Sequence, residues 1–427
     1  MASQSDRPFS AFPKHTNSEV PSDGPLNGIK VVDFSHFIAG PFCTMVLGDM
    51  GAEIIKIESA KGDDVRAFPP SDPLLDGQGS PFLWANRNKK SIVLNLKSKE
   101  GIAVVHDLVR AADVVVENFS TGVMERLGLA YDDLKKINEN LIFCSISAYG
   151  RTGAFADRLG FDTVVQAESG FMSFNGYPDR DGTRVQPVVM DTSTALMSSN
   201  AIIAALFNRE RNGGGQRIDV SLYETSLNML GYGAMQYLMN GIKPTRIGNS
   251  SNDTAPTGLF HTSDSSFFVS SSNTVIFQRI FQVIGRDDVA QDPKLQDRVG
   301  RLAHREEMAA ILQEAFGKHT WSYWEPKLRK ANVPAGEMRT LPDAFHSDVT
   351  RELGLVTRIE HPTAGEVPNI ALPIRFSETP MVDPVAAPTI GQHTRDVLEN
   401  TLGYTAEQIS TLEASDGLGA FELPKND

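Results

Sequence analysis

The sequence predicts an α/β protein with a doubly wound parallel sheet, and three observations support this class. Apolar runs typical of buried strands lie at residues 29–34 and 52–58. A helical segment at residues 41–50, with a proline in its first turn, joins them. Strand, helix and strand within about 30 residues form a βαβ unit, whose strands are parallel. The alternation then continues, with strands expected at residues 91–96, 113–117 and 141–147.

The later elements follow in order. An amphipathic helix is expected at residues 99–111, and two helical stretches lie within residues 162–210. A turn-rich hairpin and a short strand at residues 185–190 separate these two stretches. A run of three glycines then precedes a strand at residues 217–222. Beyond residue 245 the composition shifts towards Ser, Asn, Thr and Gly, which favours a smaller α+β domain, and a β-hairpin is expected near residues 361–367.

Composition and charge exclude several classes of protein. With 41% hydrophobic and 22% charged residues, the chain of 427 residues has an ordinary globular composition and room for two or three domains. No apolar run approaches the roughly 20 residues of a membrane-spanning helix. The net charge of −13 repels polyphosphate, so nucleic acid is not expected as a partner. Residues 1–25 resemble neither a secretory signal nor a transit peptide, which predicts a disordered tail on a cytoplasmic protein.

The motifs of common enzyme classes are missing where they would be needed. The first strand is followed by Ser-His-Phe-Ile-Ala-Gly-Pro rather than by G-x-G-x-x-G, which argues against a nicotinamide or flavin enzyme. The chain also has no P-loop and no G-x-S-x-G nucleophile elbow. The nine histidines and the two cysteines, Cys43 and Cys144, show no metal-ligand spacing, so no metal site is expected.

One acidic residue stands at a position suited to chemistry. Asp191 follows the short strand expected at residues 185–190 and precedes Thr-Ser-Thr and an apolar helix. A carboxylate at such a junction lies at the helix N-terminus, where backbone N–H groups and the helix dipole favour an anion. The residues alone leave two roles open for Asp191, an ordinary N-cap or a nucleophile that attacks an activated acyl group.

Many short motifs occur in a fixed order from Leu26 onward. They are PLNGIKVVD at 25–33, AGP at 39–41, GAEIIKIE at 51–58, NKKSIVLNLK at 88–97, ADVVVENF at 112–119 and GGQRIDVSL at 214–222. Weaker matches follow at 256–258, 332–336 and 391–394. Together these motifs resemble the class III CoA-transferases, the group that includes formyl-CoA transferase and carnitine CoA-transferase.

The resemblance implies a fold and an assembly. Members of this family have a large Rossmann-like domain built from both chain ends, a small domain between them, and two subunits interlocked as rings in a homodimer. Applied to this chain, the family pattern gives a tail, an N-terminal part of the large CoA-binding domain, a linker helix, a small α+β domain, and a return linker with the C-terminal part of the large domain. The expected boundaries are 1–25, 26–225, 226–244, 245–340 and 341–427.

The resemblance also implies a reaction, in which CoA moves from an acyl-CoA donor to a free carboxylic acid. The family's catalytic aspartate corresponds to Asp191. Its carboxylate would attack the donor thioester to form a mixed anhydride, and the released CoA thiolate would then convert the anhydride into an aspartyl-CoA thioester. The acceptor acid would repeat these steps in reverse. Succinyl-CoA is the expected donor, CoA and its thioesters are substrates, and no permanently bound cofactor is implied.

Residue by residue, the resemblance assigns five contacts with CoA, namely Leu94, Lys97, Asn118, Phe119 and Arg126. Lys97 and Arg126 would supply positive charge for the phosphates, and Phe119 would pack against the adenine or the pantetheine arm. Without the resemblance, Lys97 fits equally well as a solvated lysine at a strand end, and Arg126 as a charge on a helix surface.

Three further residues are expected near the substrate acid. His36 could hydrogen-bond a carboxylate, with a capping or packing role as the alternative. Ile38 and Phe161 stand where formyl-CoA transferase has a glutamine and a tyrosine, and residues 248–254 lack its glycine-rich lid, so specificity for formyl-CoA or oxalate is not expected. The polar segment 248–254 and the lack of a long apolar pocket motif favour a small polar acceptor, such as itaconate, mesaconate, sulfinopropionate or a carnitine-like acid.

Two other functions fit less well. An α-methylacyl-CoA racemase needs two bases, which in that family are a histidine and an aspartate 30 residues apart. The residue 30 positions before Asp191 is Phe161, and its ring cannot take a proton. A non-catalytic protein that only binds CoA esters would not need Asp191.

Overall fold

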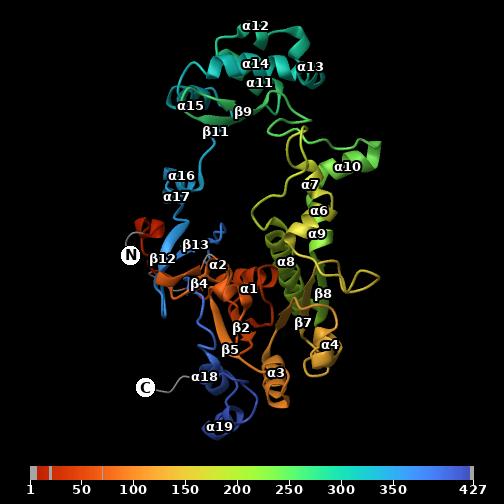
Figure 1. Cartoon of the computed structure of the whole chain (residues 1–427), viewed down its shortest axis with the longest axis vertical. Coiled ribbons are helices and arrows are strands. Elements are labelled where there is room, and N and C mark those ends of the chain that lie inside the picture. Colours follow the sequence, from red (N-terminus) through yellow and green to blue (C-terminus); the bar gives the residue numbers. More distant parts are fainter. Residues whose placement is uncertain (1–6, 19–21, 70, 424–427) are drawn as a thin grey trace. The chain divides into compact units, whose positions relative to one another are not determined.

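The computed structural model describes residues 7–18, 22–69 and 71–423, which form two units (Figure 1). The small unit contains Met172–Arg184 and Gln236–Thr350, and the large unit contains the remainder. Both ends of the described chain therefore belong to the large unit. Residues 172–184, expected in the large domain, belong to the small unit because Gly248 and Arg246 hydrogen-bond the backbone of Gly176 and Tyr177.

A six-stranded parallel sheet forms the centre of the large unit, which confirms the predicted α/β class. Its strands are β1 (Lys30–Asp33), β2 (Glu53–Glu58), β5 (Lys89–Val93), β6 (Val114–Glu117), β7 (Ile142–Ser147) and β8 (Gln216–Ser221), in the order β5-β2-β1-β6-β7-β8. The chain moves outward from β1 through β2 to β5 and then returns to pair β6 with the other side of β1. β1 and β6 therefore flank a switch point, the place where parallel α/β sheets bind ligands.

Alternating strand residues build a core on each face of this sheet. Val31 belongs to the core that β1 shares with α1 (Ala39–Asp49) and α8 (Val189–Asn212). Its neighbour Val32 belongs to the opposite core, which contains α3 (Lys99–Ala111) and residues near the C-terminus. The C-terminal segment thus completes one face of a sheet made by the N-terminal half.

The remaining elements are shorter. The large unit also contains α2 (Ser80–Ala85), α4 (Val123–Leu127), α5 (Tyr131–Leu134), α6 (Asp162–Glu168), α9 (Leu222–Met229), α18 (Thr394–Asp396), α19 (Ala406–Ala414) and the strand pairs β3 (Ser71–Asp72) with β4 (Gln78–Gly79) and β12 (Val356–His361) with β13 (Gly365–Ile370). The small unit has a sheet of β11 (Ala335–Glu337), β10 (Ser266–Ser270) and β9 (Thr257–His261), with α11 (Thr274–Val283), α12 (Asp287–Ala290), α13 (Arg298–Ala303), α14 (Arg305–Phe316), α15 (Trp321–Lys330) and α16 (Leu341–Phe345). Three helices span the unit boundaries, namely α7 (Phe171–Phe174), α10 (Gly231–Asn240) and α17 (Asp348–Leu353).

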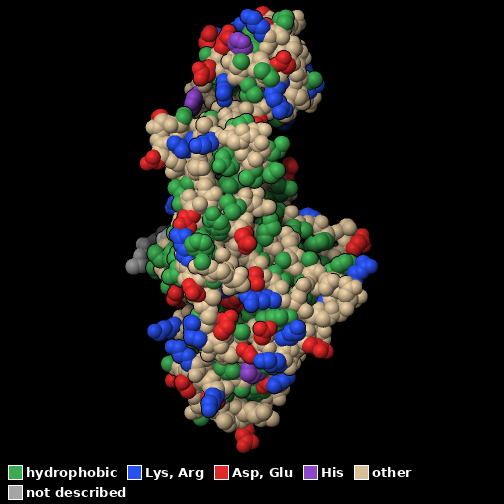
Figure 2. Space-filling model, turned by 90° about the vertical axis from the view of Figure 1, so that its right-hand side faces the viewer, with side chains coloured by type: hydrophobic (Ala, Val, Ile, Leu, Met, Phe, Trp, Pro, Cys, Tyr) green, Lys and Arg blue, Asp and Glu red, His purple; other side chains and the backbone are tan. Residues whose placement is uncertain are grey.

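Charges of both signs are interspersed on the face of the molecule shown in Figure 2. That face presents no broad basic stripe of the kind that binds a polyphosphate backbone. Within the described part of the chain, every helix is too short or too polar to cross a bilayer.

The disordered tail predicted for residues 1–25 is wrong for residues 7–18. The backbone of Arg358 in β12 donates to Pro13 at 2.9 Å and accepts from His15 at 2.8 Å. Phe9 packs against an apolar cluster that includes Ile359 of the same strand, which gives this segment buried surface to hold it. The predicted tail also covers residues 1–6 and 19–21, which lie outside the described residues.

The short strand predicted at residues 185–190 is also absent from the structure. α8 begins at Val189, so Asp191 lies in its first turn rather than before it. The cap comes instead from Asp162, whose Oδ2 accepts from the backbone N–H of Met190 at 2.7 Å and of Asp191 at 3.3 Å. The N-cap role considered for Asp191 is therefore wrong, because another carboxylate fills it.

Candidate functional site

A pocket of about 620 Å³ lies at the carboxyl edge of the sheet, beside the switch point. Segments that end or follow four neighbouring strands form its walls, at residues 34–36, 56–63, 94–97 and 119. Parallel strands bring these segments together because their carboxyl ends share one edge. Among the residues assigned from the sequence, His36, Leu94, Lys97 and Phe119 line this first pocket.

A second pocket of about 290 Å³ adjoins the first, with which it shares His36, Phe119 and Val123. Asn118 and Phe161, also assigned from the sequence, line this second pocket. A ligand longer than one pocket could therefore continue past His36 into the other.

The assigned CoA contacts differ in their surroundings. Leu94 is buried, and its backbone N–H donates to the carbonyl of Glu58. Leu94 can therefore offer only a small apolar surface to the first pocket. Lys97 is exposed at the pocket lining, where its ammonium group is free to meet an anion. Arg126 is exposed on α4 and lies outside both linings.

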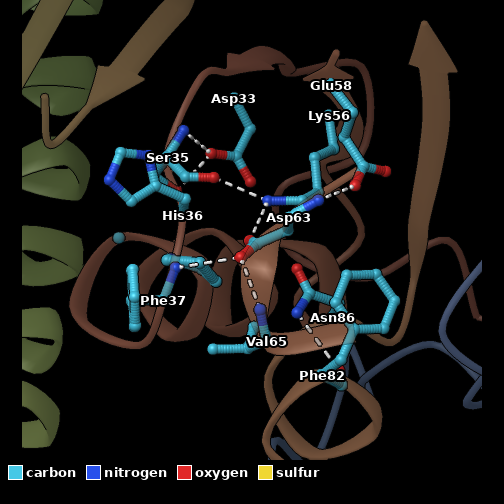
Figure 3. Close-up of polar contacts among 12 residues, drawn as sticks. Asp33, Ser35, His36, Phe37, Lys56, Glu58, Asp63, Val65, Phe82 and Asn86 are labelled. Atoms are coloured by element: carbon cyan, nitrogen blue, oxygen red, sulfur yellow. Dashed lines mark hydrogen bonds and ion pairs between the residues drawn. The ribbon is translucent and has the colours of Figure 1, made fainter. Parts of the chain in front are cut away.

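The turn at residues 35–38 lines these pockets, and a buried ion pair holds it (Figure 3). The side chains of Lys56 and Asp63 are each only 1% exposed, with Nζ and Oδ2 3.0 Å apart. Lys56 Nζ also donates to the carbonyl of Ser35 at 2.6 Å, and Asp63 Oδ1 accepts from the N–H of Phe37 at 3.3 Å. Phe37 has φ +60°, a conformation that aromatic residues rarely adopt. The ion pair thus holds a strained turn in place.

Asn118 holds the same turn from the other side of the switch point. Its Oδ1 accepts from the N–H of His36 at 2.9 Å, and its Nδ2 donates to the carbonyl of His36 at 2.8 Å. The His36 ring lies against Phe119, with the ring centroids 5.3 Å apart. Burial lowers the pKa of His36, which favours a neutral imidazole that can either donate or accept a hydrogen bond.

A second buried cation lies behind the turn. Lys89 Nζ donates to Asp33 Oδ2 at 3.1 Å, to the carbonyl of Pro41 at 2.9 Å and to Asn86 Oδ1 at 2.9 Å. Burial opposes ionisation of Asp33, but the charges of Lys89 and Lys56 lower its pKa to about 2. Asp33, Lys89 and Lys56 therefore form a buried network of charges that compensate one another.

The Asp191 carboxylate has a different environment. It is half-buried, and no hydrogen bond or ion pair reaches it from the residues that the structure describes. Burial raises the pKa of Asp191 to about 7, and the negative charge of Asp162 contributes to the increase. Asp162 is 4% exposed, and its other oxygen accepts from Gln166 at 2.6 Å. A carboxylate that lacks donors keeps its lone pairs available for attack on carbon.

Neither Asp191 nor Asp162 lines the first or the second pocket, but the residue that precedes Asp162 in the chain lines the second pocket. The residue before Asp162 is Phe161, which lines that pocket and is 63% exposed. Sequence reasoning missed Asp162, although it shows the signal that singled out Asp191, an acidic residue at the start of an apolar helix.

Comparisons with known proteins point to one family. The model of CoA-transferase family III matches residues 26–394. The chain is 34% identical to succinyl-CoA:glutarate CoA-transferase of Mus musculus over 399 residues, covering 93% of this chain and 91% of that protein. It is 35% identical to succinate–glutarate CoA-transferase of Agrobacterium fabrum, covering 88% of this chain and 95% of the relative. A CAIB/BAIF family protein from Brucella suis superposes with a TM-score of 0.79 at 34% identity, covering 89% and 99% of the two chains. The chain therefore belongs to CoA-transferase family III.

Proposed function

We propose that this protein transfers CoA from succinyl-CoA to a free carboxylic acid, with Asp191 as the covalent nucleophile. The observation that carries the proposal is a half-buried carboxylate, without donors among the described residues, at the start of α8. The names of the relatives from mouse and Agrobacterium fabrum support succinyl-CoA as the donor.

In the first half-reaction, the Asp191 carboxylate attacks the thioester carbonyl, and the carbon–sulfur bond breaks. The products are a mixed anhydride of Asp191 with succinate and the CoA thiolate. The thiolate then attacks the aspartyl carbonyl, so that succinate leaves and an aspartyl-CoA thioester remains. The acceptor carboxylate attacks this thioester, and the returning thiolate takes the acceptor acyl group and restores Asp191. Each step exchanges one acyl bond for another, so the chemistry balances without an added reactant.

The two adjoining pockets fit the two ends of CoA in this proposal. The first pocket, with Lys97 at its lining and the Phe119 ring on one wall, suits the nucleotide part. The pantetheine arm would pass His36 into the second pocket, towards Phe161. Asn118 acts here through the backbone of His36, which it positions.

Mass spectrometry after incubation with succinyl-CoA tests the proposal. A CoA adduct is expected on the peptide that contains Asp191, and carboxylic acids should discharge it as acyl-CoA. A protein that forms no adduct but exchanges the α-hydrogen of a branched acyl-CoA with solvent deuterium would instead be a racemase, and the proposal would fail.

Removing the charge of Asp162 is expected to shift the pH dependence of adduct formation. In an Asp162→Asn variant the side-chain oxygen can still cap α8, while the amide nitrogen replaces the oxygen that accepts from Gln166. The negative charge of Asp162, which adds to the effect of burial on the pKa of Asp191, is lost. A lower pKa means that Asp191 is ionised at lower pH, so the midpoint of the pH–rate profile should fall by about one unit. The exposed Asp132, in the first turn of α5 and outside both pocket linings, gives the matched control Asp132→Asn. A reduced rate with an unchanged midpoint would leave Asp162 a purely structural role.

Lys97→Ala is expected to raise the KM for succinyl-CoA by about tenfold and to change kcat little, because a phosphate contact stabilises the ground state and the transition state equally. Arg126→Ala should act in the same direction but more weakly, since Arg126 lies outside both linings. Lys99→Ala, an exposed lysine two positions further along, is the control. Equal effects of Lys97→Ala and Lys99→Ala would remove Lys97 from the site.

We also propose that two subunits associate as the interlocked homodimer that the family resemblance implies. Apolar side chains are exposed along α8 and α9, with Phe207 61% and Met197 45% exposed, more than an isolated monomer usually shows in one region. Phe207→Asp combined with Met197→Asp should shift the sedimentation coefficient from dimer to monomer at micromolar concentration while the circular dichroism stays unchanged. A wild-type protein that sediments as a monomer would refute the proposal.

A further inference from the structure

A third pocket of about 570 Å³ lies in the large unit, with the β12–β13 hairpin as one wall. We call it the hairpin pocket. Its walls are mostly apolar, with Leu75, Trp84, Ile359 and Val367 among them. The volume falls within the range of about 300–1,000 Å³ that is usual for small-molecule sites. The pocket is distinct from the two pockets beside the switch point, with which it shares no lining residue.

Two buried oxygens of residues that line the hairpin pocket have no hydrogen-bond partner among the described residues. Asn369 is only 5% exposed, and its Oδ1 accepts no hydrogen bond, although its Nδ2 donates to Thr357 Oγ1 at 3.1 Å. The buried Oε1 of Gln78, which also lines the pocket, is unpaired as well. Nearly all buried polar atoms in folded proteins have a partner, so two unpaired acceptors in one pocket point to a ligand that donates.

The charged side chains of this pocket are already paired. Arg87 donates from Nε and Nη2 to Asp49, with the shortest contact at 2.6 Å. Asp72 accepts from Arg7. The pocket therefore offers an apolar body and neutral acceptors, and a ligand group that bears a net charge would find no free counter-charge among these pairs.

The hairpin pocket reaches the segments that carry the chemistry. Ile38, the last residue of the turn held by Lys56 and Asp63, lines it. Val188 also lines it and precedes Asp191 by three residues. Ile38, which the sequence places near the reacting groups, thus lines an apolar pocket. Its side chain suits the carbon chain of a substrate better than the glutamine of formyl-CoA transferase would.

Building on the function proposed above, we propose that the hairpin pocket binds the carbon chain of the substrate acid whose carboxylate reacts at Asp191, and selects a chain that ends in a hydroxyl group. A hydroxyl can donate to Asn369 Oδ1 or Gln78 Oε1, which a methyl group would leave unpaired. An ionised second carboxylate cannot donate a hydrogen bond, so its oxygens would be repelled by Asn369 Oδ1 and Gln78 Oε1. The preferred acid is therefore an apolar-bodied hydroxy acid, which is larger and less polar than the acceptor expected from the sequence.

The test uses straight-chain acids of six to ten carbons in three forms: unsubstituted, with a terminal hydroxyl, and as the dicarboxylic acid. Each acid serves as acceptor in the discharge of the succinyl-CoA-derived adduct, and its binding is measured separately by isothermal titration without CoA. At the best chain length, the hydroxy acid should exceed the unsubstituted acid about tenfold in kcat/KM and in affinity. A dicarboxylic acid that performs equally well or better would overturn the proposal.

Two variants tie this preference to the pocket. Asn369→Val should reduce the tenfold preference for the hydroxyl to less than threefold. Ile370→Trp should fill the pocket and weaken all three acids, since Ile370 lines it and is 42% exposed, so that the larger ring is tolerated. Val385→Trp is the matched control, because Val385 is 66% exposed and outside the lining. Identical behaviour of Ile370→Trp and Val385→Trp would overturn the assignment.

The two readouts separate this proposal from the proposed function. If an adduct forms and is discharged but Asn369→Val and Ile370→Trp change nothing, the hairpin pocket is not the acid site, and the transferase proposal stands. If no adduct forms but the hydroxy acid binds to the wild-type protein and not to Ile370→Trp, the pocket proposal stands, and the transferase mechanism fails.

Discussion

In the Asp191→Asn variant, transfer of CoA from succinyl-CoA to any acceptor acid is expected to fall by at least about 10³-fold. Asparagine has nearly the same size and keeps the first turn of α8, but its amide oxygen is too weak a nucleophile to open a thioester. Binding of succinyl-CoA should remain, because both pockets beside the switch point are unchanged. Initial rates together with equilibrium titration separate the two effects, and Asp132→Asn, in the first turn of α5, controls for the loss of one carboxylate charge. Turnover close to the wild-type rate would exclude Asp191 as the nucleophile.

The same variant has a second expected property, a gain in stability at alkaline pH. The pKa of Asp191 is about 7 in the folded protein and 3.8 as its ordinary value. Between these values the folded state holds a proton that the unfolded chain has released, so wild-type stability falls as the pH rises from about 4 to 7. Asparagine has no proton to lose. At pH 8 the variant should be more stable by about 1–2 kcal/mol, less than the full pKa difference would give, because the carboxyl is partly exposed.

Lys56→Met is expected to lower the free energy of unfolding by about 3–5 kcal/mol, since it removes one partner of a buried ion pair. The carboxylate of Asp63 and the carbonyl of Ser35 would both lose their donor in a site that water hardly reaches. The turn at residues 35–38 should then relax, and the KM for succinyl-CoA should rise. Urea denaturation and steady-state kinetics measure the two effects.

Lys90→Met provides the matched comparison for Lys56→Met. Lys90 lies on the neighbouring strand β5 and forms an ion pair with Glu53 at 2.8 Å, but its side chain is 35% exposed. Loss of a partly exposed pair should change stability by less than about 1 kcal/mol. If the two variants lost the same stability, burial of Lys56 would not be what makes its ion pair important.

The parallel sheet could be predicted from the sequence because each strand is a local pattern. Apolar runs such as those around Val31 and Ile54 identify buried strands without knowledge of their neighbours. The strand predicted before Asp191 failed because the side chain of Gln166 bonds both the N–H and the carbonyl of Val185, and the chain bends at residues 186–187. A period-two pattern does not reveal whether a partner strand exists. Local patterns thus predict the elements better than their pairing.

The supporting residues of the site could not be predicted, because their roles depend on contacts between distant segments. In the sequence, Lys56 is a single polar residue within a predicted strand. Only the fold brings its ammonium group to the carbonyl of Ser35, 21 positions away. Asn369 and Gln78 are ordinary polar residues in the sequence and become a pair of unpaired acceptors only when the hairpin meets residues 72–87. Asp191, in contrast, is singled out by a pattern within a few residues of itself, but that pattern leaves its role open, and only the family resemblance indicates a nucleophile.

The segment formed by residues 7–18 has a practical consequence for work on shortened forms of this protein. The family match begins at residue 26, which makes that position an obvious place to start a recombinant chain. Such a chain would lack Phe9, the backbone partners of Arg358, and the arginine that pairs with Asp72. Each of these contacts supports a wall of the hairpin pocket, so under the two proposals above trimming the N-terminus would alter acid selectivity without removing Asp191 or the residues that line the two pockets beside the switch point. Kinetic comparisons between full-length and trimmed proteins would then report on the substrate rather than on the catalytic step.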